Sequence, residues 1–147
     1  VDVITGMMDS EIVVKHTLRN NQKMSIKNFW ICELNAQTMS NAACLYIYRS
    51  AFLKANQLLF PIGLHHEDEY FTPMALLKAE SILPTDVCYY HYRVNEASIT
   101  NNQKNFDKNY MDLCFILKQL EQEYNQIKDE ILKAKLLESL LEKLSFY

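Results

Sequence analysis

Apolar residues recur through the last third of the chain at the spacing of one helix face. Seven of them alternate at intervals of three and four residues and define a seam of about three heptads: Tyr110, Leu113, Leu117, Leu120, Tyr124, Ile127 and Ile131. From Leu132 to Leu144, leucines continue an apolar helical face in a shifted phase, with Lys and Glu residues between them. The pattern predicts a long helix that is interrupted, by a kink or by the start of a second helix, near Lys133.

The first two thirds of the chain contain shorter apolar runs. Runs rich in β-branched and aromatic residues predict strands at residues 1–5, 44–48 and 87–94. A short helix is predicted from Arg49 to Asn56, since asparagine commonly ends a helix. The segment at 29–32 mixes both kinds of residue, and we assign it to neither type.

A further helix follows the acidic residues at 67–69. Its start has two interpretations: Thr72 is the N-cap and Pro73 the first helical residue, or Asp68 caps an earlier start and Pro73 lies in the first turns. Only two glycines and three prolines occur in the chain, which argues against long linkers and glycine-rich phosphate loops. We predict a helix-rich α+β fold with few strands, comprising a domain over 1–105 and a C-terminal helical extension over 106–147.

Charge and cysteine content narrow the range of partners and compartments. Fifteen basic and eighteen acidic side chains give a net charge of -3 without a basic block, so we expect no nucleic-acid partner. The four cysteines lack a C-x-x-C pair and lie among apolar neighbours, which predicts buried, reduced thiols. No apolar run approaches the roughly 18 residues that cross a bilayer. We predict a cytoplasmic protein, with peripheral contact at the inner face of the membrane as an alternative.

Five consecutive residues from His65 to Glu69 can each bind protons or metals. Neighbouring side chains diverge in a helix and alternate in a strand, so the five cannot converge on one ion, and we expect no metal site. One interpretation of this cluster is a solvated acidic helix start. The other is a functional site in which helix N–H groups orient a carboxylate.

A family pattern connects this cluster with other parts of the chain. Its pieces occur in the order Tyr46–Leu53 (YIYRSAFL), Phe60–Gly63 (FPIG), His66–Phe71 (HEDEYF), Tyr90–Arg93 (YHYR) and Ser98–Thr100 (SIT). In this order and spacing the pieces resemble the second half of bacterial family 2 glycosyltransferases of the GT-A type. Such enzymes build capsule, lipopolysaccharide and exopolysaccharide. The resemblance covers about residues 1–102 and does not extend to the helical tail.

The resemblance implies an inverting transfer of a sugar from a nucleotide-sugar to a glycan or lipid-linked acceptor. It makes Asp68 the catalytic base, because a sugar hydroxyl attacks well only when a carboxylate takes its proton. A carboxylate at a helix N-terminus should remain ionised near neutral pH, as a base requires. Glu67 would orient the acceptor or the base. His66 and Arg93 are candidate substrate contacts, and a packed histidine and a structural ion pair are their alternatives.

Enzymes of this family also hold a divalent cation, Mg or Mn, on the donor diphosphate through a D-x-D motif. No two aspartates of this chain have that spacing. The chain begins with Val1 in a β-branched run, as though inside a fold. We therefore expect the nucleotide-binding half to precede Val1, and this fragment alone to bind neither donor nor cation and to be inactive.

The helical tail and the strand aromatics each allow more than one role. The tail can form a hairpin over the domain's own sheet, associate with another copy, or lie on an anionic membrane through its lysines. Tyrosines such as Tyr48 and Tyr90 can stack on sugar rings, although core packing is the commoner role of strand aromatics. The rival to a transferase is a helical interaction module whose function lies in the heptad seam.

Overall fold

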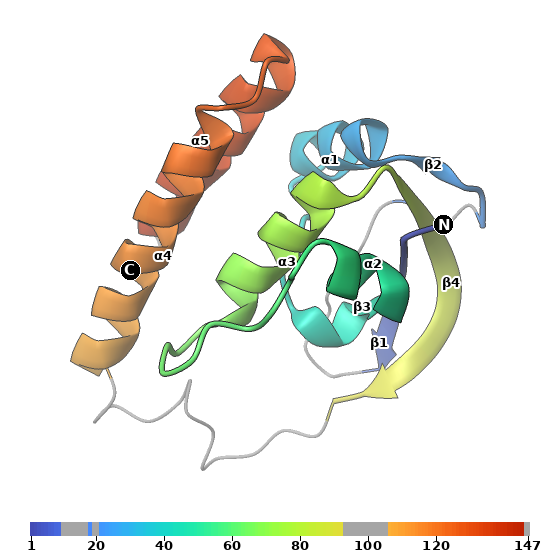
Figure 1. Cartoon of the computed structure of the whole chain (residues 1–147), viewed down its shortest axis with the longest axis horizontal. Coiled ribbons are helices and arrows are strands. Elements are labelled where there is room, and N and C mark those ends of the chain that lie inside the picture. The colour runs from blue at the N-terminus through green and yellow to red at the C-terminus, as the bar shows by residue number, and fades with distance from the viewer. Residues whose placement is uncertain (10–17, 19–20, 93–105, 146–147) are drawn as a thin grey trace.

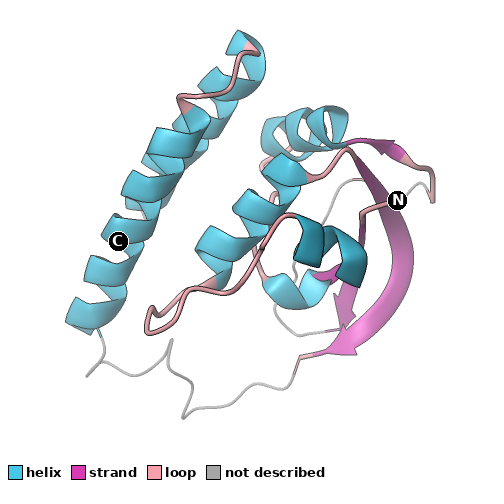
Figure 2. Cartoon of the chain, in the orientation of Figure 1, coloured by secondary structure: helices cyan, strands magenta, loops and turns pink. Residues whose placement is uncertain are grey.

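The computed structural model describes residues 1–9, 18, 21–92 and 106–145 of the 147-residue chain. In this part of the chain, a small four-stranded mixed sheet is combined with five α-helices (Figure 1, Figure 2). The strands are β1 (Val3–Asp9), β2 (Met24–Ser25), β3 (Tyr46–Tyr48) and β4 (Ser81–His91). The helices are α1 (Ile26–Asn35), α2 (Ser50–Ala55), α3 (Asp68–Lys78), α4 (Phe106–Tyr124) and α5 (Glu130–Ser145), with a 3-10 turn η1 at Ala43–Leu45. The fold is α+β and rich in helices, as predicted.

The sheet has the strand order β2-β4-β1-β3. The two central strands, β1 and β4, are parallel, and the short edge strands β3 and β2 run antiparallel to them. The strand predicted at 87–94 begins earlier, at Ser81, and includes Pro84. Proline and the polar residues beside it conceal the strand in the sequence, because proline lacks the N–H that a ladder uses. Val94 lies outside the described residues.

Residues 29–32, which the sequence pattern left unassigned, belong to α1. Ser25 precedes this helix, and its hydroxyl accepts a hydrogen bond from the N–H of Asn28 at 3.3 Å. This is the N-cap arrangement, which satisfies one of the free donors at a helix start. Phe29, Trp30 and Glu33 are then buried on one face. The cap, not the apolar content of the segment, was the sequence signal for this helix.

The helices lie in two layers on one side of the sheet (Figure 1). The inner helices α1 and α3 lie between the sheet and an outer hairpin formed by α4 and α5. The hairpin therefore packs on α1 and α3 and does not cover the sheet directly. One cluster of buried side chains joins all three layers, from Val3 and Ile82 of the sheet through Leu76 of α3 to Leu120 and Leu136 of the hairpin.

The tail forms two helices, which is one of the two alternatives that the change of phase left open, but the break comes before Lys133. Helix α4 ends at Tyr124, and α5 begins at Glu130 after a turn in which Asp129 accepts a hydrogen bond from the N–H of Leu132 at 3.1 Å. The heptad seam is buried from Leu113 to Tyr124, but Tyr110 and Ile131 at its ends are 43% and 65% exposed. In the part of the chain that the structure describes, no helix combines the length and apolarity that crossing a membrane requires.

Candidate functional site

Helix α3 begins at Asp68, with Pro73 inside it. The earlier start is therefore correct, but Asp68 is the first helical residue instead of the cap, and Thr72 is a buried interior residue. Glu67 occupies the N-cap position, where its carbonyl accepts from the N–H of Phe71 at 2.9 Å. His66, just before it, has a φ of 59° in the left-handed region. The tight turn at His66 redirects the chain from the loop at 58–64 into the first turn of α3.

Asp68 is half-buried, and burial is the main cause of its raised pKa. The charges of Glu69 and Glu67 raise the pKa further, whereas the backbone N–H groups of Ala43 and Glu69 act in the opposite direction. The helix N-terminus alone would lower the pKa of this carboxylate. The observed shift has the opposite direction, because loss of solvent outweighs the N–H groups. A raised pKa makes Asp68 a stronger proton acceptor when ionised.

Three side chains gather around Asp68, and together we call these four residues the Asp68 cluster: Cys44, Tyr48, Asp68 and Thr72. Burial is the main cause of the raised pKa values of Tyr48 and the Cys44 thiol. The charge of Asp68 adds to both shifts, for Tyr48 after that of Tyr89. The Tyr48 hydroxyl lies close to that of Thr72, yet neither makes a hydrogen bond of good geometry with any group of the described residues. Buried hydroxyls normally find a partner, so these two have hydrogen-bonding capacity to offer a ligand or water.

An aromatic ladder connects the Asp68 cluster to the surface. Tyr46 stacks on Tyr48 with ring centroids 6.0 Å apart, and Tyr48 meets Phe71 edge-on at 5.5 Å. Phe71 stacks in turn on Phe60 at 3.9 Å. Tyr46 is 6% exposed and Phe60 is 46% exposed, so the ladder runs from the core to solvent. Core packing is confirmed for Tyr46, whereas Phe60 offers exposed aromatic surface.

The other residues of the sequence-predicted cluster have different surroundings. Glu67 is exposed, and His66 is half-buried. The backbone N–H of His65 donates to Asp112 Oδ2 at 2.8 Å, and its Nδ1 lies 2.6 Å from Asn109 Oδ1, so this histidine fastens the loop to α4. Arg93 lies outside the described residues, as does Ser98–Thr100. Glu67 is therefore the neighbour of Asp68 in the described residues, and the predicted role of Arg93 stays a prediction.

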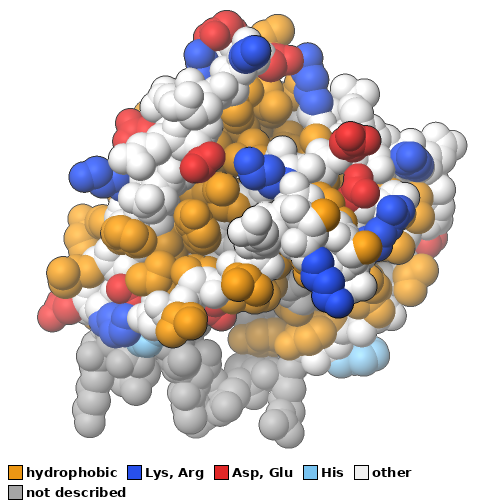
Figure 3. Space-filling view, in the orientation of Figure 1, with side chains coloured by type: hydrophobic (Ala, Val, Ile, Leu, Met, Phe, Trp, Pro, Cys, Tyr) orange, Lys and Arg blue, Asp and Glu red, His pale blue; other side chains and the backbone are white. Residues whose placement is uncertain are grey.

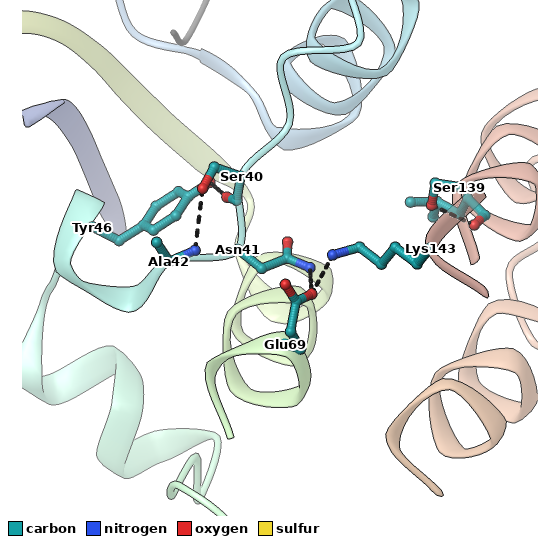
Figure 4. Close-up of polar contacts among 8 residues, drawn as sticks. Ser40, Asn41, Ala42, Tyr46, Glu69, Ser139 and Lys143 are labelled. Carbon is teal, nitrogen blue, oxygen red and sulfur yellow. Dashed lines mark hydrogen bonds and ion pairs between the residues drawn. The ribbon is translucent and has the colours of Figure 1, made fainter. Parts of the chain in front are cut away.

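Glu69 belongs to a polar network that sequence analysis missed (Figure 4). Its Oε2 accepts from Asn41 Nδ2 at 2.7 Å and forms an ion pair with Lys143 of α5. No sequence signal links Glu69 with a lysine in the tail, because only the packing of the hairpin on α3 brings them together. The C-terminal helices thus contact the residue next to Asp68.

A second missed residue is Glu33, whose carboxylate is fully buried in α1. It accepts from the backbone N–H of Leu18 at 3.0 Å and from the hydroxyl of Thr38 at 2.8 Å. Such hydrogen bonds are what makes a buried carboxylate tolerable. Its contacts tie the chain on both sides of α1, which indicates a structural role.

The four cysteines are free thiols, but they are less buried than expected. Cys32, Cys44 and Cys114 are half-buried, and Cys88 on the outer part of β4 is exposed, so the prediction of burial was wrong for Cys88. Its strand continues past the core, where helices no longer cover it.

No group of three or more His, Cys, Asp or Glu side chains within the described residues is arranged to hold a metal ion. The scan against protein-family models found no match to the chain, and the search of curated proteins found no match either. We therefore infer the function of the chain from the geometry around Asp68 and from the sequence motifs that surround it.

Proposed function

We propose that this chain is the acceptor-side part of an inverting family 2 glycosyltransferase of the GT-A type, with Asp68 as its catalytic base. The observation that carries the proposal is the surroundings of Asp68: a half-buried carboxylate with a raised pKa beside two buried hydroxyls that make no hydrogen bond of good geometry within the described residues. An acceptor hydroxyl bound there would give its proton to Asp68 while its oxygen bonds to the anomeric carbon. The sugar–phosphate bond breaks at the same time, and the nucleoside diphosphate leaves with its electron pair.

The surrounding residues suit a sugar acceptor. Burial holds the pKa of Tyr48 above its usual range, so its phenol keeps its proton and can donate to an acceptor oxygen. The exposed ring of Phe60 offers an apolar surface of the kind that packs on a sugar face. His66, which is half-buried, and Glu67, which is exposed, directly precede Asp68 in the chain and are the proposed acceptor contacts. Arg93 is proposed to bind phosphate through its guanidinium group.

The donor site forms no part of this chain in the proposal. The seven aspartates stand at 2, 9, 68, 86, 107, 112 and 129, and none forms a D-x-D motif. The divalent cation and the nucleotide-sugar would bind to a preceding half of a longer enzyme. That enzyme would act in the synthesis of bacterial surface polysaccharide, in the cytoplasm or peripherally at the inner face of the membrane.

The alternative function is a helical interaction module, and the structure changes which surface of the hairpin such a module would use. Leu113, Leu117 and Leu120 of the heptad seam are buried within the chain itself, so the seam is not offered to a partner. The outer face of the hairpin nevertheless carries exposed apolar residues, including Met111, Phe115 and Leu141. Self-association or membrane contact would therefore use this outer face.

The decisive experiment is Asp68→Asn in the longer enzyme, with membranes as the acceptor source and radiolabelled nucleotide-sugars as donors. Loss of a general base should lower the transfer rate by about 100-fold or more. Asp107→Asn is the matched control, because it also removes a carboxylate from the first turn of a helix, at an exposed position of α4. Circular dichroism checks the fold. Transfer at a near-normal rate by Asp68→Asn would remove Asp68 from the mechanism.

A further inference from the structure

A pocket of about 660 Å³ lies between the hairpin and the inner helix α1, apart from the Asp68 cluster. Its walls come from α1, from the loop that follows it and from both helices of the hairpin. The volume is within the range of about 300–1,000 Å³ that small-molecule sites occupy. Apolar side chains gather along the junction between the hairpin and its neighbours in the space-filling view (Figure 3).

The lining of this pocket is apolar on one part and hydrogen-bonding on another. Trp30, which meets Tyr124 edge-on with centroids 6.2 Å apart, forms an aromatic wall with it. The amides of Gln37 and Asn41 supply donors and acceptors, although Asn41 already donates one N–H to Glu69. The hydroxyl of Ser139 donates to the Leu136 carbonyl oxygen at 2.7 Å and so offers the pocket an acceptor. A ligand that fits must present an apolar surface together with several hydroxyl or amide groups.

The charges of the pocket disfavour an anionic ligand. Lys143 lines the pocket and is paired with Glu69 (Figure 4). Glu142, which also lines the pocket, carries another negative charge. The positive charge is therefore balanced locally, and a phosphate or carboxylate would find no surplus cation. A pyranose sugar is neutral, has apolar C–H faces and carries hydroxyls around its edge.

We propose that this pocket binds a neutral sugar unit. Two of its lining residues, Asn41 and Lys143, bind Glu69, which directly follows Asp68 in the chain. One residue thus links the pocket with the base. On the assignment of a glycosyltransferase, on which this part of the inference rests, the bound sugar is a unit of the acceptor beyond the one that reacts. The C-terminal extension would then help to select the acceptor.

Trp30 allows a direct test, because it is the only tryptophan of the chain and lines the pocket. The 147-residue chain is titrated with glucose, galactose, rhamnose and N-acetylglucosamine while the tryptophan fluorescence is followed. At the binding energy per atom typical of small ligands, a monosaccharide should saturate the signal with a Kd of about 1 mM. The absence of a saturable change with all four sugars would overturn the proposal.

Two glutamines provide a matched pair of variants. Gln37 follows α1 and lines the pocket, whereas Gln57 follows α2 outside it, and their φ values of 54° and 52° are both left-handed. Glycine adopts this conformation more readily, so neither Gln37→Gly nor Gln57→Gly should impair folding. Gln37→Gly removes a pocket amide and should weaken sugar binding about fivefold. Gln57→Gly should leave the Kd unchanged, and equal effects of the two variants would contradict the site.

The binding assay needs neither donor nor transfer, so the two proposals can fail separately. Saturable sugar binding together with normal transfer by Asp68→Asn would keep the pocket and reject the catalytic assignment. Loss of transfer by Asp68→Asn without any sugar binding would reject the pocket alone.

Discussion

Asp68 stands at the first position of α3, where backbone N–H groups favour a negative charge. The protein around it nevertheless raises its pKa, chiefly because the carboxylate has lost contact with solvent. Asp112 on α4 shows the opposite behaviour, since the N–H of His65 and then the ammonium group of Lys108 lower its pKa. Asp68 is therefore unfavourable for folding in its charged form, a common cost at functional sites, while Asp112 is favourable.

We predict opposite effects on stability when each of these carboxylates becomes an amide. The pKa of Asp68 in the folded state is raised above the ordinary 3.8, so its stabilising contribution exists in acid and is lost as pH rises through the folded value. Asp68→Asn should therefore be more stable than the wild type at pH 7, and this difference should shrink as the pH falls from the raised folded value to the ordinary 3.8. Urea denaturation across the pH range measures it.

Asp112→Asn is the control, because its expected change in stability has the opposite sign. Its lowered pKa gives stability that is present above the ordinary 3.8 and lost as pH falls through the folded value. The variant should be less stable than the wild type at neutral pH, with the difference closing in acid. If Asp68→Asn were instead the less stable variant at pH 7, burial could not be the dominant influence on Asp68.

At the scale of elements, the hairpin of α4 and α5 has two apolar faces with different surroundings. The inner face contributes Leu120 and Leu136, at 1% and 0% exposure, to the common core. The outer face leaves Leu141 69% exposed. The same hairpin thus has one face that packs on its own chain and another face that is available to partners.

Leucine truncation on the two faces should separate these roles. Leu120→Ala leaves a cavity in the core and should lower the free energy of unfolding by about 2–5 kcal/mol. Leu141→Ala should change it by no more than about 0.5 kcal/mol. Urea denaturation at two protein concentrations is the measurement. A concentration-dependent loss in Leu141→Ala would show that the outer face is buried between copies, as a self-associating module requires.

For the whole molecule, the three layers share one hydrophobic core. The sequence pattern instead predicts a domain over 1–105 and a separate helical extension over 106–147. Trp30 of α1 and Tyr124 of α4 are in edge-on contact across this division. Glu69 and Lys143 form an ion pair across it. Without the hairpin, the outer sides of α1 and α3 would expose apolar surface to water.

We predict that both parts unfold in one cooperative transition. Trp30 fluorescence reports the junction of α1 with the hairpin, and far-UV circular dichroism reports all helices, so the two urea curves should coincide. The slope of each curve should correspond to the surface of the whole chain. Two separate transitions would instead make 106–147 an independent unit, as a division into two domains implies.

Local patterns in the sequence determined much of the secondary structure and the place of the candidate base. Periodicity predicted two tail helices, β-branched runs predicted β1 and β3, and helix formers predicted α2, because neighbours along the chain decide these features. The HEDEYF motif identified Asp68 at a helix start. The limits of β4 and the turn after Tyr124 were less accurate, since Pro84 and Asp129 act through local geometry that a periodic pattern does not contain.

Only the tertiary structure decided what surrounds these elements. The raised pKa of Asp68 depends on burial beside Tyr48, and the Glu69–Lys143 pair joins residues 74 positions apart. Gly6 is another example, since an added Cβ would lie 2.3 Å from the Tyr89 ring and 2.7 Å from the Val87 carbonyl oxygen. Desolvation, ion pairing and steric fit arise from groups that are distant in sequence, so one chain without its packing cannot specify them. The sequence therefore determined most of the elements and the position of the candidate base, whereas the packing decided the electrostatics of that carboxylate and formed the pocket between α1 and the hairpin.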